Sequence, residues 1–166
     1  VLISSGEYDK ASERLMANVE INNHLAFDHD LESSYELLLR DSSPIEPQAS
    51  EHVGDQDPVM ILYTGGTTGR SKGALHSHKS VYMGMLNQTV AERVVPTDVY
   101  MLTGQMFHIP IVLAINYMSH GCPVVLINFE AKLALEVIQR EKVSAFLGIT
   151  TMLNWMMAVD DFDRYD

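Results

Sequence analysis

The sequence predicts an α/β fold, with a mostly parallel sheet whose strands are joined by crossover helices. Short runs rich in β-branched and aromatic residues alternate with segments of helical period, which is typical of parallel strands and crossover helices. The later short runs are almost continuously apolar, as strands covered on both faces should be. With 166 residues, 46% of them hydrophobic, the chain can bury a sizeable core, and this excludes a disordered or collagen-like polymer.

Six runs of Val, Ile, Leu, Tyr or Phe, bounded by turn-forming residues, predict strands. In chain order they are 1–4, 24–27, 59–63, 99–103, 124–127 and 145–149. Two helices between them carry apolar stripes, which we expect to lie in the core. The stripes are Val81, Tyr82, Met85, Leu86 and Val90, and then Leu133, Ala134, Val137 and Ile138.

One long loop divides the predicted domain. Residues 41–58 are rich in Ser, Pro and acids, and we expect them to separate a leading α/β piece, 1–40, from a larger piece, 59–166, within one partial domain. The chain starts inside an apolar run, without methionine or a signal-peptide pattern, which suggests an excised piece of a longer protein.

Charge limits the partners. The formal net charge of −11 argues against nucleic acid and anionic lipid. Residues 59–129 differ from the rest, because they hold only two acids against the cations Arg70, Lys72, Lys79 and Arg93. Such a short positive region suits a small anion.

Cysteine content and hydropathy bear on the cellular setting. Cys122 is the single cysteine, so no internal disulfide or zinc cluster is expected, and we predict a reducing, cytoplasmic environment with Cys122 as a packing residue. Residues 99–129 contain no charge, but Gly, Pro, His and Asn interrupt them. We therefore read them as a strand, a helix and a strand, not as a membrane span.

The segment most informative about function is 59–73, VMILYTGGTTGRSKG, an apolar strand followed by a small, hydroxylated and basic loop and then a helical pattern. Glycines here allow positive φ and close approach of backbone N–H groups to anionic oxygens. Threonine hydroxyls add donors that can also orient a phosphate-bound Mg²⁺, and the cations add positive charge. The predicted phosphate-binding residues are Thr64, Gly65, Gly66, Thr67, Thr68, Gly69, Arg70, Lys72 and Gly73.

Other kinds of loop fit this segment less well. A Gly-rich turn capped by threonines would explain the glycines, but it does not explain the cations. The Walker A spacing fails because Ser71 precedes Lys72 and Gly73 follows it, and no G-x-G-x-x-G occurs in this segment.

Residues Tyr63 to Gly73 resemble the phosphate loop of adenylate-forming enzymes, the superfamily of acyl-CoA synthetases, luciferases and peptide-synthetase adenylation domains. The family pattern is [YF]-T-S-G-[ST]-T-G-x-P-K-G, and here Gly65 replaces its serine and Ser71 its proline. The next segment also resembles the family, which places a histidine before the following helix. His78 fits that position, but a helix-start residue bonded locally explains it equally well.

Two later segments resemble the same family. MLTGQMFHIP at 101–110 is similar to the strand that delivers an aromatic and histidine pair, here Phe107 and His108, beside the acyl pocket. Residues 120–153 are similar to the strand, helix, strand and helix that follow, with Gly148 near the acyl pocket; a buried strand end before a Thr-capped helix explains Gly148 equally well. His120 has no such support and is expected at a helix end.

The resemblance implies part of the N-terminal domain of an acyl-CoA synthetase that uses ATP, Mg²⁺ and coenzyme A. It would activate a carboxylic acid as acyl-AMP and transfer the acyl group to a thiol. The implied catalytic residues are Thr67, Lys72 and His108, with Thr67 also at the metal and Phe107, His108 and Gly148 at the substrate pocket.

Complete members of the family continue beyond the matched region with a metal-contacting acidic motif and a C-terminal domain with a catalytic lysine, so we expect this piece to be inactive without the rest of the enzyme. The acids at 160–166 are read as a solvated terminus. A fatty or other hydrophobic acid is favoured over an amino acid, because no acidic residue lies near Phe107 or Gly148 to pair with an amine. A non-catalytic nucleotide-binding module and a peptide-synthetase adenylation domain remain alternatives.

Overall fold

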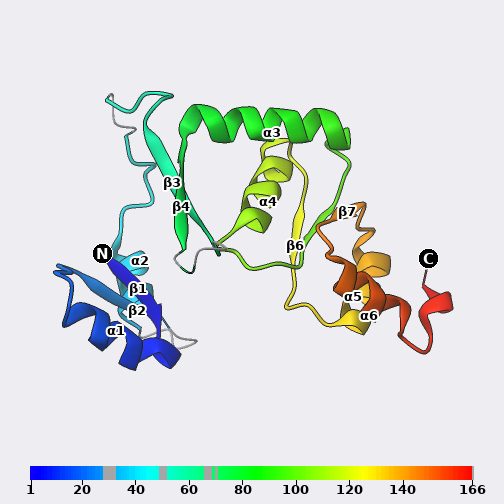
Figure 1. Cartoon of the computed structure of the whole chain (residues 1–166), viewed down its shortest axis with the longest axis horizontal. Helices are drawn as coiled ribbons and strands as arrows, with labels where there is room; N and C mark the ends of the chain where they lie inside the picture. Colours follow the sequence, from blue (N-terminus) through cyan, green and yellow to red (C-terminus); the bar gives the residue numbers. More distant parts are fainter. Residues whose placement is uncertain (28–32, 49–51, 66–68, 70, 166) are drawn as a thin grey trace. The chain divides into compact units, whose positions relative to one another are not determined.

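A computed structural model describes residues 1–27, 33–48, 52–65, 69 and 71–165, and the chain divides into two compact units, Val1–Ser50 and Glu51–Asp166. The α/β prediction is confirmed: within the described ranges there are six α-helices, and strands pair in parallel in two of the three sheets (Figure 1). Among these residues no helix is both long and apolar enough to cross a bilayer.

The first unit is a small β-α-β arrangement followed by a helix. Strand β1 (Leu2–Ser5) pairs in parallel with β2 (His24–Phe27), and the connection contains the 3-10 turn η1 (Gly6–Tyr8) and helix α1 (Asp9–Met16). Ser4 and His24 link the strands through Oγ and Nε2 at 2.8 Å. Ser33 caps helix α2 (Ser34–Asp41), since its hydroxyl accepts from the backbone N–H of Glu36.

The second unit opens with a β-hairpin. Strand β3 (Pro58–Thr64) pairs antiparallel with β4 (Lys72–Ser77), and helix α3 (His78–Glu92) follows directly. Ser77 caps α3, since its Oγ accepts from the N–H of Ser80 at 3.2 Å. Sequence analysis missed β4, because it read the chain after the loop as the approach to a helix.

A three-stranded parallel sheet forms the centre of this unit, in the order β6-β5-β7. Strand β5 (Tyr100–Leu102) lies between β6 (Val124–Leu126) and β7 (Ala145–Phe146). Helices α4 (Ile109–Ser119) and α5 (Ala131–Glu141) connect the strands, and α6 (Thr150–Met157) and the turn η2 (Phe162–Arg164) follow β7. Glu130 caps α5 by accepting from the N–H groups of Lys132 and Leu133.

Strand β5 is covered on both faces, as its apolar sequence predicts. Tyr100 and Leu102 pack in one buried cluster with Ala114 and Tyr117 of α4. Met101 packs in a second cluster, with three residues of α5 and one of α6. These are Ala134, Leu135, Val137 and Met156. The core of the second unit therefore has three layers, with α4 on one face of the sheet and α5 and α6 on the other.

A polar network joins α3 to α4, which lie against each other in Figure 1. Asn116 is 1% exposed, and its Nδ2 donates to Gln88 Oε1 at 3.0 Å and to Thr89 Oγ1 at 3.2 Å. Tyr117 donates its hydroxyl to Glu92 Oε2 at 2.8 Å. Because these partners satisfy a buried amide, the network fixes how α3 sits on α4.

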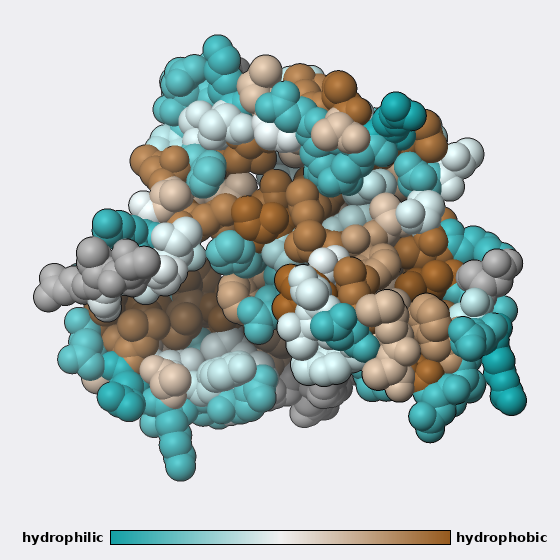
Figure 2. Space-filling model, turned by 45° about the vertical axis from the view of Figure 1, so that its right-hand side comes forward, coloured by the Kyte–Doolittle hydropathy of each residue, from teal (hydrophilic) through white to brown (hydrophobic). Residues whose placement is uncertain are grey.

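The two predicted core stripes have different outcomes. Ala134 and Val137 of the second stripe are buried, with Leu133 and Ile138 packed against them, so that prediction is confirmed. The first is wrong in part, because Tyr82, Leu86 and Val90 are exposed. The spacing of the apolar residues predicted helix α3 correctly, but it did not predict which face of α3 helix α4 covers. Exposed apolar side chains leave apolar areas on the surface. Figure 2 shows one face of the molecule, where brown apolar residues lie beside teal polar ones.

Candidate functional site

The predicted phosphate loop closes the β3–β4 hairpin. Thr64 and Lys72 are paired across the two strands, and Thr64 Oγ1 lies 3.5 Å from the carbonyl oxygen of Lys72. The hairpin thus holds the two ends of the loop side by side. Lys72 is exposed at the start of β4, and no described acidic side chain forms an ion pair with it.

Within the loop, Gly65 and Gly69 are described, whereas Gly66, Thr67, Thr68 and Arg70 lie outside the described residues. Gly69 has φ +83°, a left-handed conformation that favours glycine, and an added Cβ there would meet nothing within 4 Å. The backbone therefore favours glycine at this position, as expected for the loop.

Gly73 differs from Gly69 in its backbone conformation. It lies in β4, outside the loop, and its φ is not positive. A Cβ at Gly73 would stand 2.8 Å from Ile61 Cγ2 and 3.3 Å from Tyr63 Cζ. The absent side chain makes room for two side chains of the neighbouring strand, so Gly73 supports the hairpin and does not turn it.

The other candidate residues follow the carboxyl ends of the parallel strands. From β5 the chain leaves toward α4, and from β6 and β7 it leaves toward α5 and α6 on the opposite face. The strand order also reverses at β5, since β6 lies on one side of it and β7 on the other. Loops that diverge in this way open a crevice at the carboxyl edge, the usual place for a ligand in an open α/β sheet.

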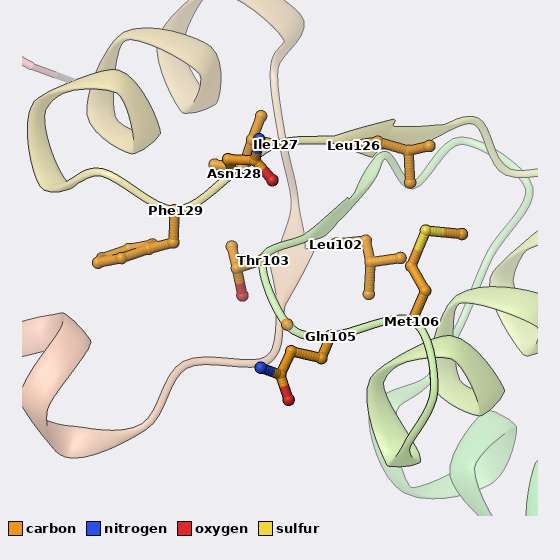
Figure 3. A pocket seen from close by; sticks show the side chains of 9 residues that line it. Leu102, Thr103, Gln105, Met106, Leu126, Ile127, Asn128 and Phe129 are labelled. Atoms are coloured by element: carbon orange, nitrogen blue, oxygen red, sulfur yellow. The ribbon is translucent and has the colours of Figure 1, made fainter. Parts of the chain in front are cut away.

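A hollow of about 530 Å³ lies at that edge, between the loops after β5 and β6. Figure 3 shows Leu102, Met106 and Leu126 gathered on one side and Phe129 on the other, with Thr103 and Gln105 on the β5 loop between them. Among the described residues that line it, none carries a charged side chain. The complete lining is Leu102, Thr103, Gly104, Gln105, Met106, Leu126, Ile127, Asn128 and Phe129.

Phe107 and His108 stand at the end of the same β5 loop. Phe107 is 75% exposed, and His108 is the half-buried N-cap residue of α4, whose carbonyl oxygen accepts from the N–H of Ile111. Gly148 follows β7, where an added Cβ would stand 2.8 Å from Phe146 Cε2. The structure thus brings the loop of His108 and the loop of Gly148 to one edge of the sheet.

Three further residues have local partners. His78 is the exposed first residue of α3, and its N–H donates to the carbonyl oxygen of Asp57. His120 follows α4 with Nδ1 2.9 Å from the carbonyl oxygen of Asn116, at the helix end as expected. Cys122 is buried in the α4 cluster, and burial raises the pKa of its thiol, so packing is confirmed as its role.

Sequence reasoning missed Thr103, Gln105, Asn128 and Phe129 in the lining of the hollow. All four lie within three residues of the end of β5 or β6. Both strands were predicted from the sequence, so the rule that ligands bind at carboxyl ends could have selected these residues.

Comparison with known proteins agrees with this architecture. The family model described as AMP-binding enzyme matches residues 1–166. The indoleacetate–CoA ligase of Aromatoleum aromaticum is 32% identical over 134 residues, which cover 75% of this chain and 25% of the relative. The chain therefore spans about a quarter of the length of that relative.

Solved structures give the same picture. The inhibitor-bound N-terminal domain of FACL13 from Mycobacterium tuberculosis matches with a TM-score of 0.83 and 26% identity, over all of this chain and 42% of that one. ATP-bound MatB from Rhodopseudomonas palustris matches with a TM-score of 0.80 over 95% of this chain and 31% of its own; at 23% identity, that likeness concerns the fold alone.

Proposed function

Because the chain belongs to the family of AMP-binding enzymes, we propose that it supplies the phosphate-binding and acid-binding parts of an ATP-dependent ligase that joins a carboxylic acid to coenzyme A. The rest of the enzyme completes the site, and this piece alone is inactive. The reducing, cytoplasmic setting expected from the single cysteine is part of the proposal.

The reaction has two steps. A carboxylate oxygen attacks the α-phosphorus of ATP, the bond to the β-phosphate oxygen breaks, and pyrophosphate leaves. The thiolate of coenzyme A then attacks the acyl carbon, and AMP leaves as the thioester forms. Negative charge grows on the pyrophosphate oxygens in the first transition state, so donors placed there before reaction lower its barrier.

The observation that carries the proposal is that the β3–β4 hairpin holds the two ends of the predicted phosphate loop side by side. Lys72 starts β4 directly beside Thr64, the last residue of β3, and Gly69 turns the chain between them. The ammonium group of Lys72 and the loop N–H groups would bind the β- and γ-phosphates, together with Thr67, Thr68 and Arg70. Thr67 would also meet a Mg²⁺ ion carried by the phosphates, which would neutralise their charge when bound; hydroxyl oxygen is a suitable ligand for it.

The hollow at the carboxyl edge supports a hydrophobic acid. Its lining has no charged side chain and five large apolar ones, so an α-ammonium group would find no carboxylate among these residues. The five are Leu102, Met106, Leu126, Ile127 and Phe129. We assign Phe107, His108 and Gly148, which follow the carboxyl ends of β5 and β7, to the approach of this acid, with His108 beside the reacting carboxylate. This argument favours a fatty or aromatic acid over the amino acid of a peptide-synthetase adenylation domain.

The test is acid-dependent exchange of labelled pyrophosphate into ATP by the complete protein that carries these residues. Lys72→Ala should slow exchange by about a hundredfold or more, because removal of one transition-state donor costs about 3 kcal/mol. Lys79→Ala is the matched control, since Lys79 is another exposed lysine of the same region, in the first turn of α3. It should leave exchange unchanged.

Equal rates for Lys72→Ala and the unmodified protein would refute the assignment of the loop. ATP binding without exchange for any carboxylic acid tested would instead support the non-catalytic nucleotide-binding alternative.

A further inference from the structure

We infer that Thr103 is a positioning residue, which fixes the loop of Gly148 against the loop of His108; this inference rests on the proposed function. Thr103 is the first residue after β5, and its Oγ1 donates to the carbonyl oxygen of Leu147 at 2.8 Å. Leu147 is the first residue after β7 and directly precedes Gly148. The bond therefore joins the two loops where each leaves the sheet.

The ladder between these strands is too short to do this alone. Strand β7 pairs with β5 only at Ala145 and Phe146, opposite Tyr100 and Met101. Beyond Phe146 the two chains diverge to opposite faces of the sheet. The side-chain bond of Thr103 therefore continues the link between the two loops beyond the point where the backbone pairing ends.

Thr103 is a rigid donor. It is 8% exposed, and Leu102 before it lies in the sheet. Gly104 after it is pressed against α4, since an added Cβ would stand only 2.5 Å from Cγ of Pro110. A β-branched side chain on a backbone held at both sides has few rotamers, so its hydroxyl direction is set before any ligand binds. Figure 3 shows its place on the β5 loop, in the lining of the hollow.

The accepting loop transmits any displacement to Gly148. The Cα of Gly148 is already enclosed, because an added Cβ would stand 2.8 Å from Phe146 Cε2 and 3.3 Å from Leu153 Cδ2. If the carbonyl group of Leu147 lost its donor, Gly148 and the start of α6 would move relative to the β5 loop. In the proposed ligase the β5 loop lines the hollow assigned to the acid, so the expected effect of such a displacement is on acid binding and not on ATP.

The opposite edge of the same strands offers a matched control. The N–H of Val99 donates to Ser144 Oγ at 3.0 Å, and Ser144 Oγ donates to Asp98 Oδ1 at 2.8 Å. Ser144 thus ties β7 to β5 at the amino end, as Thr103 does at the carboxyl end. Ser144→Ala removes a comparable bond without touching either candidate loop.

The experiment compares Thr103→Val, Thr103→Ser and Ser144→Ala in the complete protein. Hydrogen exchange should rise about fivefold or more in residues 147–150 of Thr103→Val and stay unchanged in α5. In pyrophosphate exchange, Thr103→Val should raise KM for the acid about five- to tenfold, as loss of one buried hydrogen bond predicts, with KM for ATP unchanged. Thr103→Ser should restore both values, and Ser144→Ala should change neither. If the valine variant does not fold, Thr103→Ala replaces it.

Each other outcome counts against the inference. Unchanged hydrogen exchange in residues 147–150 of Thr103→Val would mean that the bond does not hold the loop. Faster hydrogen exchange with an unchanged KM for the acid would mean that the bond has a structural role only. A parallel rise in KM for ATP would indicate general damage to the protein. If the unmodified protein shows no acid-dependent activity, the proposed function fails and the role in acid binding falls with it, whereas the exchange data still decide whether Thr103 holds the loop.

Discussion

Strands β3 and β5 are both composed mainly of apolar residues, yet their surroundings differ. All three residues of β5 are at most 2% exposed, because helices cover both faces of its sheet. In β3, Ile61 is 54% and Tyr63 is 63% exposed. An apolar run therefore predicts a strand but not its burial, which depends on the layers that the rest of the chain places around it. In the proposed ligase the buried strand supports the hollow assigned to the acid, and the exposed hairpin carries the predicted phosphate loop.

The largest expected difference between the two strands is in the loss of stability when a side chain is truncated. Met101→Ala should lower the free energy of unfolding by about 2–5 kcal/mol, because Met101 is 0% exposed and its removal leaves a cavity between β5, α5 and α6. Ile61→Ala in β3 should cost less than about 1 kcal/mol. Urea unfolding of both variants measures this, and equal losses would show that the hairpin is buried in solution.

Glycine substitution gives a smaller contrast of the same kind. Gly104→Ala should cost about 1–3 kcal/mol, since its Cβ would stand 2.5 Å from the ring of Pro110 at the start of α4. Gly73→Ala in the hairpin should cost less, because Ile61 and Tyr63 are exposed and can move aside. Thermal unfolding compares the two, and a larger loss for Gly73→Ala would reverse the order of rigidity.

The smallest expected change in stability should be equal at two helix ends, one after α3, which follows the hairpin, and one after α5, which covers β5. Arg93 after α3 and Lys142 after α5 both have φ +56°, in the left-handed region that glycine adopts without strain. Arg93→Gly and Lys142→Gly should each stabilise the chain by about 0.5–1 kcal/mol, once the greater chain entropy of glycine is included. Chemical denaturation checks both, and a gain at only one helix end would show that tertiary packing, not local strain, decides the outcome.

Much of the fold could be predicted from the sequence because its signals are local. Strand β2 was predicted with its observed limits, and the stripe from Leu133 to Ile138 identified the buried face of α5. Strand β4 was missed because ALHSHK combines a helix-compatible residue order with the start of α3. The exposed face of α3 was mistaken for core, since only the position of α4 decides which side is covered.

The candidate site was predictable to a lesser degree. The loop from Thr64 to Lys72 has a composition that indicates phosphate binding, and its residues remain a prediction. The bond of Thr103 to Leu147 joins residues 44 positions apart, and no local pattern announces it. Pairing across a sheet must be known before such a contact can be expected.

The placement of Met101 has a consequence for synthesis of the chain. Its buried neighbours in α5 and α6 all come later in the sequence, the last of them being Met156. While the ribosome adds those residues, one side of β5 stays open to water and to other nascent chains. A polypeptide interrupted before α5 would leave that apolar side uncovered, and chaperones would be expected to bind it there.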